Sequence, residues 1–183
     1  MKKIFLVGII SLFCSNFVNA QVPIERDSVF QTPGLSISQI YDGVKKWFVV
    51  SCSDSRDVIQ IDDPANGSIV GKLFFPYDAK SLSNSASYGF VSVVVDIKIR
   101  EGRFKIKFSD FNHTSTHPKY SEWWSMGLVK KEIPDEWKSG LKWKQKRDVY
   151  NRLLPFIDNY INQKLTSLSG YMKAYIPTEE EDW

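Results

Sequence analysis

Apolar and polar residues alternate most regularly in the middle of the chain, over residues 93–111. In the stretch VVVDIKIREGRFKIKFSDF, every second residue is apolar on either side of a Glu-Gly pair. This is the pattern of two half-buried strands joined by a tight turn. A two-residue loop sets Ile99 opposite Phe104 and Ile97 opposite Ile106, so that apolar residues face each other. The pattern therefore predicts a hairpin whose register is fixed by its buried face.

Two helices are predicted from apolar residues spaced three and four apart. The first begins at Ser36, where Ser36 and Gln39 match a capping box. Its apolar face is formed by Ile37, Ile40, Tyr41, Val44, Trp47 and Phe48. The second helix is predicted from about Trp143 to Leu168, and Pro155 is expected to kink it or split it in two. Gly170 is expected to end it.

Three shorter strands complete the expected pattern. A weak strand is predicted over residues 22–31, and a hairpin pairs 58–61 with 68–75 around a Pro-Ala-Asn-Gly turn. Residues 112–136 show no periodicity and are predicted to be irregular. The order of strand, helix, four antiparallel strands, loop and long helix predicts an α+β fold with helices packed on one face of an antiparallel sheet.

The beginning of the chain predicts export. Two lysines precede a mostly apolar run, and residues 18–20 end in the small residue Ala, as in a secretory signal peptide. The run is too short for a transmembrane span. Cys14 offers lipid anchoring as an alternative, which the bulky Phe13 before it disfavours. We therefore expect a periplasmic or extracellular protein with a single domain over 21–173 and an acidic, disordered tail over 174–183.

Charge and cysteine usage narrow the classes of function. The whole chain carries 24 Lys and Arg against 21 Asp and Glu, and cleavage after Ala20 would remove two lysines and no acid. The remaining charge is close to zero, so there is no global electrostatic argument for nucleic acid. Cys52 would be the one cysteine left, which excludes an internal disulfide.

Several stretches of the chain, taken in order, resemble one known family. They are VFQTPGLSISQIYDGVKKWF, VIQIDDPANGSIVGK and VSVVVDIKIREGRFKIKFSDF. Together they resemble the domain of unknown function 4468 family, described as having a TATA-binding-protein-like fold and found in exported proteins of Bacteroidota. The resemblance covers roughly residues 27–112, and the long C-terminal helix is also family-like. It implies a curved antiparallel sheet with helices on one side, and it carries over no catalytic residues.

The predicted hairpin places five cations on one face, and this face is the first candidate site. They are Lys98, Arg100, Arg103, Lys105 and Lys107. Such a face can attract an acidic partner, an anionic glycan or lipid headgroups. It can equally be the solvated side of the sheet, since lysine and arginine cover sheet faces well and deter edge pairing. The solvated interpretation is the simpler one.

Two further candidates are an aromatic contact and a modification site. Trp123 and Trp124 fall in the irregular segment, where exposed aromatics can bind a sugar or a protein partner, and buried ones can belong to the core. If they bind a ligand, Trp124→Ala should abolish binding and keep the melting temperature. Asp27-Ser28-Val29 resembles the motif for O-glycosylation of exported Bacteroidota proteins, with Ser28 as the acceptor.

The remaining reactive residue types give no convincing site. His113 and His117 are four residues apart, but their polar surroundings predict loop histidines and not a zinc pair. Cys52 has no catalytic signature around it. Asp62, Asp63 and Asn66 fit a tight turn better than a calcium loop, which needs six or more ligands. No metal, cofactor or catalytic residue is therefore predicted.

These observations favour an exported, non-catalytic binding or interaction module of the cell envelope, whose partner is an unknown envelope protein or glycan. One alternative is a carrier of lipid or another small ligand, with a pocket between helix and sheet. A cavity lined by Trp47, Val95 and Ile157 would support it, and a filled core would argue against it. An envelope hydrolase is the other alternative, although no hydrolase motif is present.

Overall fold

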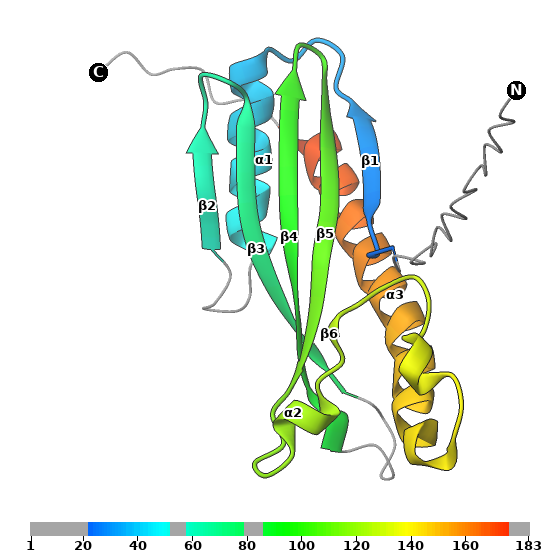
Figure 1. Ribbon diagram of the computed structural model, residues 1–183. Helices are drawn as coiled ribbons and strands as arrows, with labels where there is room; N and C mark the ends of the chain where they lie inside the picture. Colours follow the sequence, from blue (N-terminus) through cyan, green and yellow to red (C-terminus); the bar gives the residue numbers. More distant parts are fainter. Residues whose placement is uncertain (1–21, 52–57, 79–85, 176–183) are drawn as a thin grey trace, which may run out of the picture.

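A computed structural model describes residues 22–51, 58–78 and 86–175 of the chain. One antiparallel sheet has the strand order β1-β5-β4-β3-β2, and a short β6 pairs with β5. Helices α1 and α3 cover one face of this sheet (Figure 1). The elements are β1 (Arg26–Gln31), α1 (Ile37–Ser51), β2 (Val58–Asp63), β3 (Ser68–Tyr77), β4 (Gly89–Arg100), β5 (Arg103–Ser115), α2 (Ser121–Trp124), β6 (Gly127–Leu128), η2 (Asp135–Trp137), η3 (Leu141–Trp143) and α3 (Lys144–Ala174). This arrangement confirms the predicted α+β class.

The central hairpin of β4 and β5 has the predicted register. Ile99 pairs with Phe104 and Ile97 pairs with Ile106, and all four side chains are buried. The two-residue loop ends in Gly102, whose φ of 65° lies in the left-handed region that favours glycine. The pattern of apolar residues therefore set both the turn and the buried face.

Helix α1 begins with the predicted capping box. The backbone N–H of Gln39 donates to the Ser36 hydroxyl at 3.3 Å, and the backbone N–H of Ser36 donates to Gln39 Oε1 at 3.0 Å. The apolar face is buried from Ile40 to Phe48. The expectation for Ile37 was wrong, because its side chain in the first turn is exposed.

Helix α3 corrects two expectations. Pro155 does not split the helix, which runs unbroken from Lys144 to Ala174, and a kink at this residue stays a prediction. Gly170 does not end it either. The side chain of Met172, beyond this glycine, is 6% exposed and belongs to the core, so continued burial holds the last turn in place.

The segment 112–136 is more regular than predicted. Strand β5 continues to Ser115, and α2 and β6 follow it. The backbone N–H of Val129 donates to the Phe111 carbonyl at 2.7 Å, which attaches the end of this segment to β5. The first strand is shorter than expected and begins at Arg26.

The side chains between the helices and the sheet are buried. Trp47, Val95 and Ile157 are each at most 1% exposed, and none of them lines a described hollow. A cavity lined by these three residues therefore gains no support from the structure. The predicted leader, Cys52 and nearly all of the predicted tail lie outside the described residues.

Candidate functional site

The five predicted cations all lie on the sheet face that α1 and α3 leave uncovered. We call this surface the outer face. It is formed by Asp27, Val29, Asp96, Lys98, Arg100, Arg103, Lys105 and Lys107. Lys98 pairs with Lys105 and Arg100 pairs with Arg103 across the hairpin. Like charges that face each other destabilise a sheet unless something neutralises them.

Acidic residues neutralise three of the five cations. Lys105 forms an ion pair with Asp27 of β1, and Lys107 lies 2.9 Å from Glu25, just before that strand. Lys98 donates to the Ser68 hydroxyl at 2.7 Å and lies 3.7 Å from Asp96. These contacts are mutual, since Lys105 lowers the pKa of Asp27 and Glu25 raises the pKa of Lys107. Most of the predicted basic face is thus compensated from within the chain.

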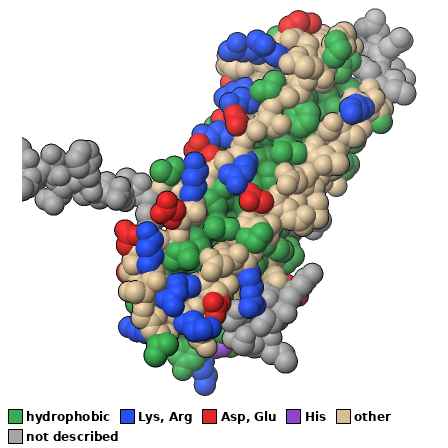
Figure 2. All heavy atoms as spheres, turned by 90° about the vertical axis from the view of Figure 1, so that its right-hand side faces the viewer, with side chains coloured by type: hydrophobic (Ala, Val, Ile, Leu, Met, Phe, Trp, Pro, Cys, Tyr) green, Lys and Arg blue, Asp and Glu red, His purple; other side chains and the backbone are tan. Residues whose placement is uncertain are grey.

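Arg100 and Arg103 are the exception. Neither guanidinium has an ion-pair partner within residues 22–51, 58–78 and 86–175. Both line a shallow hollow of ≈340 Å³, and Val29, which is 55% exposed, gives it an apolar side. Figure 2 shows the molecule from the side of β1 and α3, where lysine, arginine and acidic side chains are interspersed and do not gather into one block of a single sign. The site that remains is a pair of arginines beside an apolar residue.

The structure separates the two candidate tryptophans. Trp123 is 36% exposed and stacks on Trp143, with 5.1 Å between the ring centroids. Trp124 is half-buried and packs against the core. The pair therefore does not form one exposed aromatic patch.

Trp123 belongs instead to an aromatic cage around Lys146, which the sequence pattern did not predict. Lys146 Nζ lies 4.5 Å from the ring centroid of Trp137, 4.7 Å from that of Trp123 and 5.7 Å from that of Trp143. Burial lowers the pKa of Lys146, which is 7% exposed. Cation–π attraction explains how a lysine is held there. The cage is filled by the chain's own cation, so it joins α3 to α2, η2 and η3, which carry the three tryptophans.

The two histidines do not meet. His113 lies in β5 and is 0% exposed, so the prediction of a loop histidine was wrong for this residue. Its Nδ1 accepts the Met126 N–H at 3.1 Å, and its Nε2 lies 3.0 Å from the Ser87 carbonyl. His117 Nδ1 accepts backbone N–H groups of the following turn. Within the described ranges, no group of three metal-ligating side chains occurs.

The two aspartates at the end of β2 have structural roles. Asp63 accepts the backbone N–H of Asn66 at 3.1 Å and its side-chain amide at 2.7 Å, which confirms the turn interpretation. Asp62 accepts from Tyr41 and Lys45 of α1. Ser28 is half-buried within β1, and its modification stays a prediction.

Comparisons with known proteins agree with this fold. Residues 27–114 match the family described as a domain of unknown function (DUF4468) with TBP-like fold, which confirms the resemblance. A DUF4468 family protein from Bacteroides ovatus is 16% identical, with a TM-score of 0.54 over 86% of this chain and 90% of that one. A TBP-like protein from Parabacteroides distasonis is 11% identical, with a TM-score of 0.57 over 80% and 92%. No curated protein matches the chain.

Proposed function

We propose that this protein is a non-catalytic binding module that recognises a carboxylate-rich partner with Arg100 and Arg103 on its outer face. The predicted leader would deliver it to the cell envelope, where the partner is an acidic glycan or the acidic segment of a protein. Among the described residues, no helix is long and apolar enough to cross a membrane.

The proposal rests mainly on the two uncompensated arginines. They face each other across the hairpin, while Lys98, Lys105 and Lys107 have acidic or hydroxyl partners. Two facing cations are unfavourable in an empty site, and an anion that binds between them removes this repulsion. A guanidinium also presents its donors in a planar fork that matches a carboxylate.

The apolar side of the hollow adds a preference. Val29 exposes its side chain next to the arginines, so a partner with an apolar group beside its acid buries more surface than a bare anion. A catalytic role gains no support from the histidines, because His113 is enclosed and His117 holds a turn.

Binding of a polyanion provides the test. Polyglutamate and polygalacturonate are suitable probes, because they carry carboxylates on a peptide and on a sugar backbone. The variant Arg100→Gln/Arg103→Gln should weaken binding about tenfold or more, as expected when charge-assisted hydrogen bonds are lost. Its melting temperature should stay close to that of the parent, because exposed arginines contribute little to stability.

The matched control is Lys107→Gln/Lys119→Gln, which also removes two positive charges but from residues that do not line the hollow. It should bind both probes like the parent protein. Equal weakening by the two double variants would show general electrostatics of the face, and unchanged binding after loss of the arginines would refute the proposal.

A further inference from the structure

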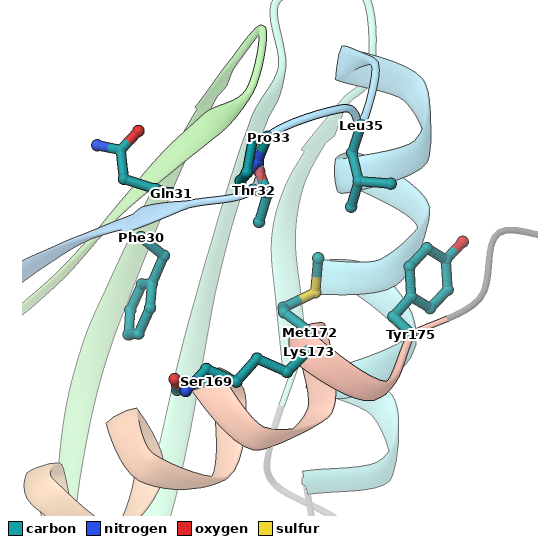
Figure 3. Close-up of a pocket in the computed structure, with 9 residues that line it drawn as sticks. All are labelled: Phe30, Gln31, Thr32, Pro33, Leu35, Ser169, Met172, Lys173 and Tyr175. Atoms are coloured by element: carbon teal, nitrogen blue, oxygen red, sulfur yellow. The ribbon is translucent and has the colours of Figure 1, made fainter.

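A second hollow lies at the same end of the molecule, on the other side of β1. It has a volume of ≈290 Å³ and is bounded by the connection from β1 to α1 and by the last turns of α3. Figure 3 shows side chains from both segments around this space. Phe30 lines this hollow and Phe104 lines the other one, and the two rings stack with their centroids 5.0 Å apart.

One buried polar group in this hollow is unsatisfied. Thr32 is 8% exposed, and its hydroxyl oxygen has no hydrogen-bond partner in the described part of the chain. Its backbone is satisfied, because the N–H of Thr32 donates to the Gly102 carbonyl at 2.8 Å and its carbonyl accepts the Leu35 N–H at 3.2 Å. The side chain alone therefore lacks a partner, which is unfavourable for a buried hydroxyl.

The hollow has apolar as well as polar walls. Phe30, Leu35 and Met172 line it from β1, the following connection and α3. Tyr175 also lines it, and the hydroxyl of this tyrosine is already engaged with Asp42 at 2.6 Å. Tyr175 thus offers mainly its ring to any molecule in the hollow.

A cation and a second hydroxyl come from the α3 side. Lys173 and Ser169 both line the hollow, and in Figure 3 the Lys173 side chain extends toward Ser169. Lys173 has no ion-pair partner among the residues that the structure describes. A positive charge at the rim, an apolar middle and an unsatisfied hydroxyl on the opposite wall form a polarised site.

We propose that this hollow binds a small carboxylic acid with an apolar body and a second hydrogen-bonding group. Its carboxylate would accept hydrogen bonds from Lys173 and Ser169, and its body would pack on Phe30, Leu35 and Met172. The Thr32 hydroxyl is enclosed in the free protein, so the Thr32 side chain would turn about its Cα–Cβ bond to pair with the second group. A volume near 300 Å³ lies at the lower end of ligand pockets, which favours a small molecule.

The test compares three probes of equal chain length: octanoate, its ω-hydroxylated form and octanol. The readout is the NMR signal of the Met172 methyl group in the full protein, with buried Met126 as an internal reference. We expect the Met172 signal to shift with both acids. The ω-hydroxylated acid should bind at least about threefold more tightly than octanoate, because it satisfies Thr32, and octanol should bind more weakly than either acid.

Two variants test the named contacts. Lys173→Gln should weaken both acids about tenfold and leave octanol unchanged, whereas the control Lys119→Gln should have no effect. Thr32→Val has nearly the same shape and should remove the preference for the ω-hydroxylated acid. It should also raise the melting temperature of the free protein, because the unsatisfied hydroxyl is gone.

Three results would overturn this assignment. The first is a Met172 signal that does not move up to roughly 10 mM acid, which corresponds to negligible affinity. The second is octanol that binds as tightly as octanoate. The third is a preference for the ω-hydroxylated acid that persists in Thr32→Val. The Arg100→Gln/Arg103→Gln variant should bind the acids normally. The hollow and the arginine site can therefore fail independently.

Discussion

Mild acidification is expected to destabilise the protein through one buried side chain, His113. Its Nδ1 accepts the Met126 N–H, so the neutral ring carries its proton on Nε2 and donates to the Ser87 carbonyl. Burial lowers the pKa of His113 from 6.5 to about 4. Protonation would place a second N–H against the Met126 N–H, where no acceptor is available.

The sign and size of the effect follow from linkage. The unfolded chain takes up the proton near the ordinary pKa of 6.5, and the folded protein takes it up only near 4. Stability is therefore complete above pH 6.5 and is lost as the pH falls toward 4. The loss amounts to about 2.5 kcal/mol between roughly pH 7.5 and 4.5. Aspartates whose pKa is lowered in the folded protein also reduce stability on acidification, but mostly when the pH falls below their ordinary pKa of 3.8.

Urea unfolding over this pH range provides the assay, with His113→Gln and His117→Gln as the matched pair. The His113→Gln protein should be less stable at neutral pH, because the Met126 N–H loses its acceptor, and its stability should be nearly flat down to about pH 4.5. His117→Gln should keep the slope of the parent protein. An NMR titration that places the His113 pKa at or above 6.5, or an unchanged slope in His113→Gln, would show that the reasoning is wrong.

Two further predictions concern stability, and urea unfolding at neutral pH checks both. Gly89→Ala should prevent folding or destabilise severely, because its Cβ would lie 1.9 Å from a backbone carbonyl oxygen of β5. At Gly102 a Cβ would meet no other atom, and only the φ of 65° is unfavourable for alanine, so Gly102→Ala should lower the free energy of unfolding by about 1 kcal/mol. Equal destabilisation by the two alanine variants would contradict this reasoning. Tyr150→Phe should cost about 2 kcal/mol, because the buried hydroxyl donates to the Lys130 carbonyl and accepts its N–H; a neutral effect would mean that water replaces it.

Local patterns in the sequence predicted the elements whose stabilising contacts are themselves local. The hairpin of β4 and β5 pairs residues close in the chain, so its alternation determines both the strands and the register. The capping box at the start of α1 spans only Ser36 to Gln39. Such features need no knowledge of the rest of the fold.

Breaking residues in α3 misled the prediction because tertiary packing outweighs them. Leu153 and Ile157 on either side of Pro155 are fully buried, whereas the proline itself is exposed. Its missing N–H leaves the carbonyl of Asn151 without a helical partner, but Asn151 is exposed and water can serve that carbonyl. Gly170 is likewise on the exposed side. Its conformational freedom destabilises the helix by less than the burial of Met172, beyond this glycine, stabilises it.

A bulge explains why His113 is buried in β5 although its polar sequence neighbours predict a loop. Alternation from Phe104 through Phe108 would place Asn112 inward and His113 toward solvent. The pairing of β4 and β5 shifts near Ser109, and Asp110 has a φ of 54°. One extra residue reverses the alternation, so that Phe111 and His113 both face the core.

The outer face shows why local sequence patterns do not suffice to predict a functional site. A count of basic side chains on β4 and β5 predicts a face with five cations, yet β1 brings Asp27 and Glu25 beside two of them. The pairing of β1 with β5 joins segments about 75 residues apart, and no local pattern records which strand lies along that edge. The compensation stops at the hairpin end, where β1 places the neutral Gln31 opposite Arg103. Among the described residues, Arg100 and Arg103 therefore receive no acidic neighbour from β1, which is why we expect recognition at the tip of the hairpin and not along its length.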